Sequence, residues 1–217
     1  LALNGFFGGG NTIPEDTFSR GLVGYWAMDE GYGTSTYDGS AYGNDGMMHS
    51  GMATTSWVSG KYGSALSFDG VDDYVNVASF AGQPTGNSAF TVEGWMKFNT
   101  LAGDRVGVCF GADSGSPTAY GVYYNNSTGK FRTAFASANG AVDSTTVPQT
   151  NQWYHIAVCR SGTSTKMFLN GTQTGSTWTD TTVYTNTSTR PLIGLDGNTG
   201  NSGYLKGNVT DVRTLTE

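Results

Sequence analysis

The acidic residues are the first candidates for catalysis, because cleavage of a glycosidic bond uses two carboxyl groups at a set separation. The 217-residue chain has four glutamates, Glu15, Glu30, Glu93 and Glu217. Carboxylates paired on one strand face would need acidic residues at position i+2 and at position i+4 or i+5 from a glutamate. No glutamate of this chain has such partners. Glu30 does follow Asp29, but adjacent strand residues point to opposite faces. The acidic pattern therefore argues against a two-carboxylate hydrolase.

Other catalytic and nucleotide-binding signatures are also missing from the sequence. The two histidines, His49 and His155, are too few for a histidine-rich metal site. We interpret His155 as a strand residue with a hydrogen-bonded ring. There is no Gly-x-Ser-x-Gly nucleophile elbow and no GxxxxGK[ST] phosphate loop. We therefore predict a protein that is not an enzyme.

Calcium is the one cofactor that the sequence favours, because Ca²⁺ takes six to eight oxygens from carboxylates, carbonyls and water. Loops rich in aspartate could supply these oxygens, although none has EF-hand spacing. The predicted ligands are Asp38, Asn44 and Asp45 in one loop and Asp69 and Asp72 in the next. Asp196 offers one more carboxylate in a third loop. The alternative for Asp69-Gly70 is a turn that the aspartate caps and in which glycine takes a positive φ.

Aromatic side chains are candidates for sugar binding, because sugar rings stack on exposed aromatic faces while polar neighbours bind the hydroxyls. The chain has 12 tyrosines and 5 tryptophans. We expect Trp95 and Trp153 to lie in the core rather than at a binding surface. The predicted ligand-binding residues, which we place in or beside variable loops, are Tyr124, Trp178, Tyr120 and Trp57.

Composition excludes several classes of protein. Glycine accounts for 33 of 217 residues, only 13% of residues are charged, and the formal net charge is −6. Eleven basic residues against 17 acidic ones argue against binding to nucleic acid. No uncharged apolar run reaches roughly 18 residues, so we predict no membrane span. Polarity comes instead from Ser, Thr, Asn and Gly, as is typical of extracellular β proteins.

Alternation of apolar and polar residues predicts the elements that would position such residues. Phe90, Val92, Met96 and Phe98 share one face of a strand over residues 90–98. The same pattern recurs over 105–111, 120–125, 130–137, 153–160 and 165–170. Asn170-Gly171 suits a type I′ hairpin turn. Because no long helical period occurs, we predict an all-β sandwich or barrel, with residues 21–217 as one domain.

The two cysteines leave two alternatives open. Cys109 and Cys159 lie 50 residues apart without a CxxC pattern. They are either small buried thiols or a single disulfide between strands. The sequence does not give the Cα–Cα distance that would decide between them.

Several segments, in order, resemble the laminin-G-like family of concanavalin A-like jelly rolls, to which the pentraxins are related. The most specific is Lys61-Tyr-Gly-Ser-Ala-Leu-Ser-Phe-Asp69-Gly-Val-Asp72-Asp73-Tyr-Val-Asn-Val. The other matching segments are 21–34, 37–46, 90–95, 153–158, 167–171, 193–197 and 207–213. The chain departs from the family pattern at Thr210, Thr214 and Leu215, where an acidic residue and a more hydrophobic strand are usual.

This resemblance implies a two-sheet antiparallel jelly-roll β-sandwich that is secreted or displayed on a cell surface. Family members commonly bind glycans or proteins, often with calcium. The resemblance thus implies a glycan or glycoprotein as partner and Ca²⁺ as a structural cofactor. Asn-x-Ser/Thr sequons, which would carry N-linked sugar where exposed, occur at Asn125, Asn126, Asn170, Asn186 and Asn208.

Residues 1–20 have no counterpart in this match. They are glycine-rich yet apolar, and Leu3, Phe6 and Phe7 could anchor the segment on the sheet edge of a second copy. Alternatively, the segment crosses its own domain or is a linker. Two functions follow. We predict a non-catalytic recognition and adhesion module that binds carbohydrate. The alternative is a structural subunit of an extracellular filament or surface assembly held by this segment.

Overall fold

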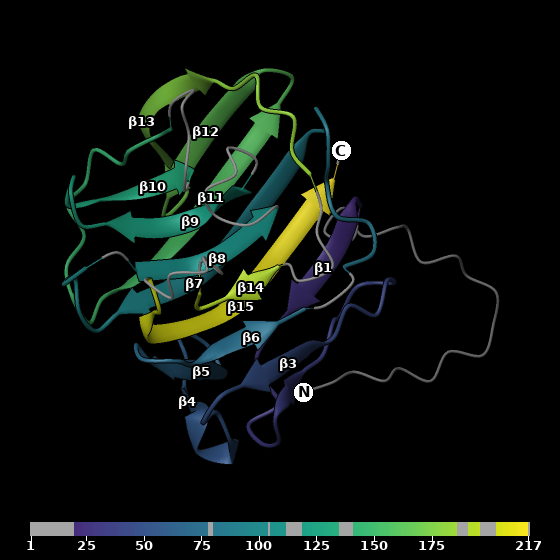
Figure 1. The fold of residues 1–217 in the computed structure, drawn as a ribbon, viewed down its shortest axis with the longest axis vertical. Helices are drawn as coiled ribbons and strands as arrows, with labels where there is room; N and C mark the ends of the chain where they lie inside the picture. Colours follow the sequence, from purple (N-terminus) through teal and green to yellow (C-terminus); the bar gives the residue numbers. More distant parts are fainter. Residues whose placement is uncertain are drawn as a thin grey trace.

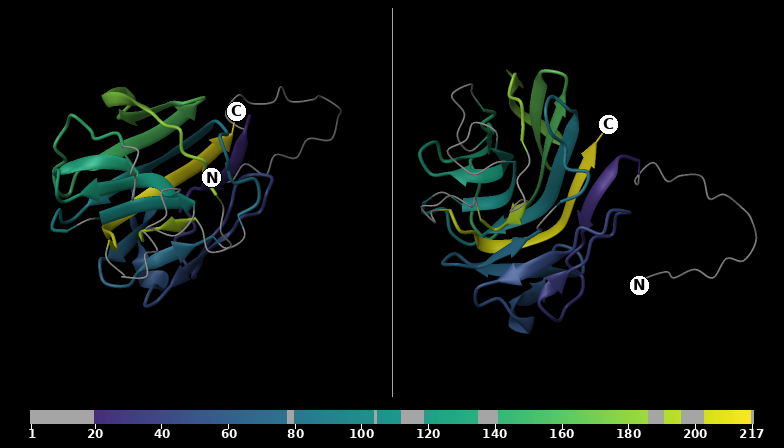
Figure 2. Two further views of the ribbon diagram at one scale, coloured as in Figure 1. Left: turned by 45° about the horizontal axis from the view of Figure 1, so that its top comes forward. Right: turned by 45° about the vertical axis from the view of Figure 1, so that its right-hand side comes forward.

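The chain folds into two antiparallel β-sheets that face each other (Figure 1). The computed structural model describes residues 20–77, 80–103, 105–111, 119–134, 141–185, 191–195 and 203–216. Within these residues the only helical element is the three-residue 3-10 turn η1 (Thr54–Ser56). Figure 2 shows the sheets as two layers. The prediction of an all-β, two-sheet antiparallel sandwich is confirmed.

One layer is an eight-stranded sheet in the order β13-β12-β11-β7-β15-β5-β4, with β1 also paired to β15. Its strands are β1 (Leu22–Trp26), β4 (Trp57–Ser59), β5 (Ser64–Asp69), β7 (Phe90–Phe98), β11 (Trp153–Ser161), β12 (Ser164–Leu169), β13 (Thr172–Thr179) and β15 (Lys206–Thr216). The last strand, β15, pairs with β5 through its first half and with β1 through its second half. Because β15 also pairs with β7 on its other side, it links β1 and β5 to β7.

The other layer is a seven-stranded sheet in the order β10-β9-β8-β14-β6-β3-β2. Its strands are β2 (Ser35–Thr36), β3 (Gly46–His49), β6 (Tyr74–Asn76), β8 (Arg105–Gly111), β9 (Ala119–Asn125), β10 (Lys130–Ala134) and β14 (Leu192–Ile193). Five of the six stretches predicted from alternation coincide with strands to within a residue or two. The sixth, 130–137, forms β10 as far as Ala134, and residues 135–137 lie outside the described part of the chain.

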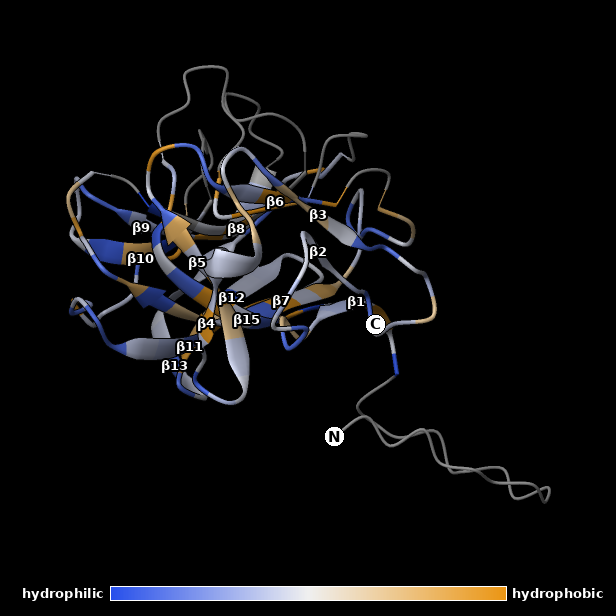
Figure 3. Cartoon of the chain, turned by 90° about the horizontal axis from the view of Figure 1, so that it is seen from below, coloured by the Kyte–Doolittle hydropathy of each residue, from blue (hydrophilic) through white to orange (hydrophobic). Residues whose placement is uncertain are grey.

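The core lies between the inner faces of the two sheets. In β7 every second residue is buried, beginning at Phe90 and ending at Phe98, as the alternation predicted. Side chains of both sheets, from Val23 to Val212, form one apolar cluster. Each large side chain buried there contributes about 1.5–3 kcal/mol. Figure 3 shows hydrophobic and hydrophilic residues mixed within the strands, as expected when one face meets the core and the other meets solvent.

The prediction that Trp95 and Trp153 lie in the core is wrong, because both occupy outward positions of the eight-stranded sheet. Each is only partly buried, and each carries a lysine over its ring. The ammonium of Lys61 lies 5.1 Å from the ring centroid of Trp95, and that of Lys97 lies 5.2 Å from that of Trp153. The core tryptophan is instead Trp26, which is fully buried.

A buried ion pair fixes the end of the sandwich where β11, β12 and β13 meet. Nε of Arg160 lies 3.6 Å from Oδ2 of Asp180, and their side chains are 1% and 0% exposed. The same carboxylate accepts hydrogen bonds from Thr165 at 2.9 Å and Tyr184 at 2.8 Å. Burial and the Asp180 charge raise the pKa of Tyr184 well above its usual value.

The two alternatives for the cysteines, buried thiols or a disulfide between strands, stay predictions. Cys159 belongs to β11 and Cys109 to β8, which lie in different sheets. For Cys109 the structure describes only the main chain.

The predicted anchors Leu3, Phe6 and Phe7 lie outside the described residues, so self-association through residues 1–20 stays a prediction. In the part of the chain that the structure describes, no helix has the length and apolar character to cross a membrane.

Candidate binding pocket

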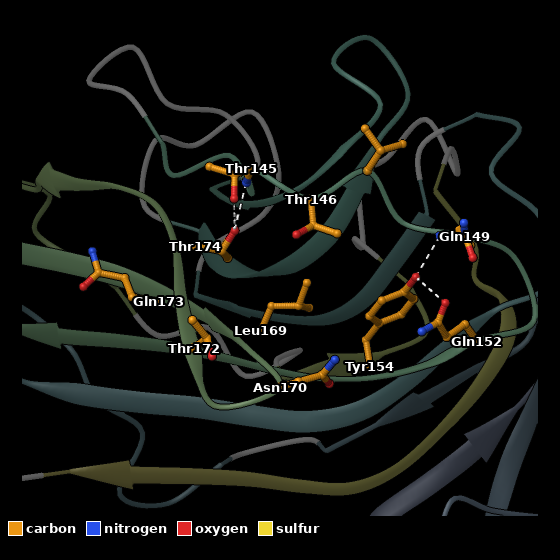
Figure 4. A pocket seen from close by; sticks show the side chains of 11 residues that line it. Thr145, Thr146, Gln149, Gln152, Tyr154, Leu169, Asn170, Thr172, Gln173 and Thr174 are labelled. Atoms are coloured by element: carbon orange, nitrogen blue, oxygen red, sulfur yellow. Dashed lines mark hydrogen bonds between the residues drawn. The ribbon is translucent and has the colours of Figure 1, made fainter.

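A cavity of about 440 Å³ opens between the connection leading into β11 and the hairpin that joins β12 to β13 (Figure 4). Eleven residues line it: Thr145, Thr146, Val147, Gln149, Gln152, Tyr154, Leu169, Asn170, Thr172, Gln173 and Thr174. Its volume lies within the usual range for small-molecule sites. One wall is the connection that leads into β11, the other wall is the β12–β13 hairpin, and Tyr154 of β11 lies between them.

The hairpin wall is held by the Asn170-Gly171 turn. Both residues have positive φ, 50° and 81°, as the predicted type I′ turn requires. Asn170 is also fastened to β11 by two hydrogen bonds with the main chain of His155. The N–H of Asn170 donates to the His155 carbonyl at 2.8 Å, and the N–H of His155 donates to Oδ1 of Asn170 at 2.9 Å. The Asn170 side chain is therefore fixed at the rim of the cavity.

The opposite wall is tied to β13 and to the seven-stranded sheet. The N–H of Thr145 donates to Oγ1 of Thr174 at 2.8 Å, and their hydroxyls lie 3.1 Å apart. Ser144 anchors the same segment, because its N–H donates to the Phe131 carbonyl at 2.9 Å. Its hydroxyl donates to the carbonyl of Thr146 at 2.7 Å. Both walls thus have a defined main-chain position without a ligand.

Tyr154 connects the floor of the pocket to the core. Its ring is buried and packs edge-to-face on Phe131, with centroids 5.2 Å apart. Its hydroxyl accepts the N–H of Gln149 at 2.9 Å and donates to Oε1 of Gln152 at 3.1 Å. Because the ring is buried, Tyr154 supplies order to the pocket rather than an exposed stacking face.

The lining is polar and uncharged. None of its eleven residues carries a carboxylate, an ammonium, a guanidinium or an imidazole. Four amide side chains, those of Gln149, Gln152, Asn170 and Gln173, offer both donors and acceptors, and threonine hydroxyls add more. Val147 and Leu169 supply apolar contact. Such a surface can bind hydroxyl-rich molecules, but it offers no general acid or base for cleaving them.

The predicted ligand-binding aromatics do not form this site. Tyr120 and Tyr124 were expected in exposed loops, but they are 1% and 6% exposed. They sit on the inward face of β9, so this prediction is wrong. Trp57 and Trp178 are partly buried and pack against the core. Neither lines the pocket, although Trp178 lies on β13, the strand of Gln173 and Thr174.

The first predicted calcium loop is a hydrogen-bonded turn. Asp38 accepts four hydrogen bonds through its two oxygens, from Tyr25, Ser40 and Asn44. Asn44 is itself buried and spends its amide on the main chain of Val23 and Ala81. Oδ1 of Asp45 accepts the N–H of Asp38 at 2.9 Å. Because both oxygens of Asp38 and the amide of Asn44 stabilise this turn, its geometry favours a metal ion less, and calcium binding by Asp38, Asn44 and Asp45 stays a prediction.

The second predicted loop does bring carboxylates together. Asp69, Asp72 and Asp73 each place a carboxylate oxygen within 4.8 Å of the others. Asp69 also caps its own turn, as the alternative interpretation expected, because Oδ1 accepts the N–H of Val71 at 2.8 Å. Burial raises the pKa of Asp73, and the negative charges of Asp69 and Asp72 raise it further. A hydrogen bond from the main-chain N–H of Asp69 partly offsets this rise by lowering the pKa. A divalent cation would relieve this repulsion, so these three residues could hold one. Asp196 lies outside the described residues.

The pocket residues were missed from the sequence because we looked for aromatic rings. A usable signal was nonetheless present in two segments, 144–152 and 170–174, which flank strands and are rich in Thr, Gln and Asn. Neither segment contains a charged residue.

Among the predicted sequons, Asn126 and Asn170 are exposed, whereas Asn125 and Asn208 are buried and Asn186 lies outside the described residues.

Two antiparallel sheets around one core, with a polar cavity beside a hairpin, define a jelly-roll-like β-sandwich. A laminin-G-type family model, described as the concanavalin A-like lectin/glucanases superfamily, matches residues 69–216. The chain belongs to this superfamily, so the family predicted from the sequence is confirmed.

Solved structures show the same fold at low sequence identity. Domain 4 of AbnA, a GH43 extracellular arabinanase from Geobacillus stearothermophilus, solved with arabinotriose, is 18% identical with a TM-score of 0.66. That comparison covers 90% of this chain and 92% of that domain. The binding domain of Paraclostridial Mosquitocidal Protein 1 is 11% identical with a TM-score of 0.67, covering 93% of this chain and 50% of that one.

Trypanosoma rangeli sialidase, solved with sialic acid, is 18% identical with a TM-score of 0.63. The comparison covers 90% of this chain but only 30% of the sialidase. No curated protein matches this sequence.

Proposed function

We propose that this chain is a non-catalytic carbohydrate-recognition domain and that the glycan binds in the cavity beside the β12–β13 hairpin. The observation that carries the proposal is the lining, in which four amide side chains and several threonine hydroxyls surround a cavity of about 440 Å³. Sugar hydroxyls both donate and accept hydrogen bonds, and amide groups match them in both respects. The absence of acidic and basic groups from the lining argues against cleavage at this site.

Two of the structural relatives lend support to a binding role, although the sialidase shows that the fold also occurs in enzymes. The arabinanase relative is a single domain of a larger enzyme and was solved with arabinotriose. The mosquitocidal relative is a domain named for binding. By analogy, the present chain supplies recognition, and we place it in a secreted or surface-displayed protein where it serves adhesion to a glycan or glycoprotein.

The expected affinity follows from the chemistry of the lining. A neutral hydrogen bond contributes about 0.5–1.5 kcal/mol net, and this pocket has no exposed ring for stacking. At about 1 kcal/mol each, four to six such bonds contribute about 4–6 kcal/mol, which corresponds to a Kd of about 0.04–1 mM. We expect weak binding to a single chain, strengthened where several copies of the glycan are displayed together.

Titration calorimetry against neutral oligosaccharides, arabinotriose among them, tests the proposal. Gln152→Ala and Gln173→Ala should each weaken binding by roughly 2- to 10-fold, since each removes one or two hydrogen bonds. Thr150→Ala and Ser176→Ala are matched controls, because both residues are exposed neighbours that do not line the cavity. If no oligosaccharide binds, or if the controls weaken binding as much as the pocket variants, the pocket is not a glycan site.

A calcium ion held by Asp69, Asp72 and Asp73 is part of the same proposal, as a structural cofactor. The ion would crosslink the two sides of the β5–β6 turn and would not contact the pocket residues. Its support is the grouping of three carboxylates within 4.8 Å, whose like charges a divalent cation would offset.

A further inference from the structure

We propose that the pocket selects uncharged sugar units and rejects carboxylated or sulfated ones. This inference rests on the proposed function and concerns the chemical class of the glycan. It is carried by two features of the pocket: the lack of any cationic side chain in the lining, and the fixed orientation of two of its amides.

The two amides are oriented by hydrogen bonds that exist without a ligand. Oε1 of Gln152 accepts from the Tyr154 hydroxyl, and Oδ1 of Asn170 accepts from the His155 N–H. Each amide oxygen is thus directed to the protein, which leaves each NH₂ group available to a ligand. In Figure 4 the two side chains flank the ring of Tyr154. This end of the pocket therefore presents neutral donors suited to hydroxyl, ring and glycosidic oxygens.

A charged sugar would lose more here than it gains. Proteins usually bind carboxylates and sulfates with arginine or lysine, because charge-assisted bonds offset the cost of removing an anion from water. In this lining only neutral donors are available, so part of that desolvation cost remains. The formal net charge of −6 adds long-range repulsion of anions. A neutral sugar meets neither cost.

Matched ligand pairs test the inference. The methyl ester of 3′-sialyllactose against 3′-sialyllactose, and methyl-esterified trigalacturonate against trigalacturonate, differ mainly in charge, and arabinotriose serves as a neutral reference. We expect the acidic member of a pair to bind about tenfold more weakly than its neutral counterpart, or not at all. Binding of the neutral member should also change little between 50 and 500 mM NaCl, because no ion pair forms (these are about one-third and three times physiological strength).

A substitution supplies the converse test. Gln173→Lys places an ammonium at the exposed edge of the pocket and should improve binding of the acidic members by about two- to fivefold. Thr179→Lys, on the same strand but outside the lining, should leave the ratio between paired ligands unchanged.

The outcomes separate this inference from the proposed function. Neutral ligands that bind while their acidic partners bind weakly support it. If acidic members bind equally well or better, or if salt weakens binding steeply, the selectivity inference is overturned and carbohydrate binding still stands. If neither member of any pair binds, the proposed function fails, and this inference fails with it.

Discussion

Replacing Arg160 with methionine should destabilise the fold strongly, because it removes one half of a buried ion pair. The guanidinium of Arg160 donates to the main-chain oxygens of Gly162 at 3.2 Å, Gly86 at 3.4 Å and Asp180 at 3.1 Å. It also lies 4.9 Å from the ring centroid of Tyr184. Methionine has a similar length and fills part of the space, so the main loss is charge and hydrogen bonding.

The magnitude follows from what is left behind. Asp180 remains fully buried and keeps its hydrogen bonds from Thr165 and Tyr184, but it loses its counter-ion. Breaking a buried pair from one side costs about 3–5 kcal/mol. Asp180 also keeps a hydrogen bond from the N–H of Thr182 at 3.0 Å, and the three remaining hydrogen bonds favour the lower end of that range. A loss of about 3 kcal/mol is a large fraction of the roughly 5–15 kcal/mol that stabilises a typical domain.

Urea unfolding followed by tryptophan fluorescence measures this loss. Arg213→Met is the matched control, because Arg213 pairs with Glu93 at 3.7 Å but has a 35% exposed side chain. Its cost should stay below about 1 kcal/mol. Adding Asp180→Asn to Arg160→Met should restore about 1 kcal/mol or more, since the unpaired charge disappears. If Arg160→Met costs no more than Arg213→Met, the buried pair does not stabilise this end of the sandwich.

Three further predictions concern the calcium loop, the first aspartate loop and alkaline pH. The Tm of the wild type should be higher in calcium than in the presence of a chelator. Asp73→Asn should abolish this difference while leaving the metal-free protein equally or slightly more stable. An unchanged wild-type Tm would refute the calcium proposal. Asn44→Ala should cost about 2–4 kcal/mol in thermal unfolding, since it breaks three buried or partly buried hydrogen bonds to Val23 and Ala81. Because the pKa of Tyr184 is raised in the native state, the native state holds the phenol proton more tightly than the unfolded chain does. The contribution of this group to the free energy of unfolding is therefore complete below about pH 10 and is lost above it. Tyr184→Phe should flatten that part of the curve of unfolding free energy against pH.

The strands could be predicted because their signal is local. In β7 and β11 alternate residues share one face, and a period of two is visible without any knowledge of the partner strand. The pattern does not by itself say which face meets the core. Trp95 and Tyr124 show the consequence, since the tryptophan faces solvent and the tyrosine is buried, opposite to our expectation. The choice depends on the second sheet, which only the assembled sandwich supplies.

The proposed calcium ligands overlap only in part with those predicted from the sequence, for a similar reason. Asp38 and Asp69 are both loop aspartates, and residue type does not separate them. In the structure both carboxylate oxygens of Asp38 accept hydrogen bonds, which come from Tyr25, Ser40 and Asn44. Asp69 instead lies beside two more carboxylates in a short turn. Whether an aspartate is available to a ligand thus depends on which donors the fold brings to it.

In the proposed glycan site, a hairpin turn would define both the shape of the pocket and its specificity. A type I′ turn favours Asn-Gly because both residues take positive φ, so Asn170 is explained by backbone geometry alone. The hydrogen bond from His155 then holds the amide oxygen, and the same turn presents the NH₂ group to the cavity. Aspartate also tolerates this backbone conformation, yet it would replace the neutral donor by an anion. Asn170→Asp should therefore preserve the hairpin and the Tm while weakening binding of a neutral oligosaccharide such as arabinotriose about tenfold. A loss of stability without a change in Kd would show that Asn170 serves the turn only.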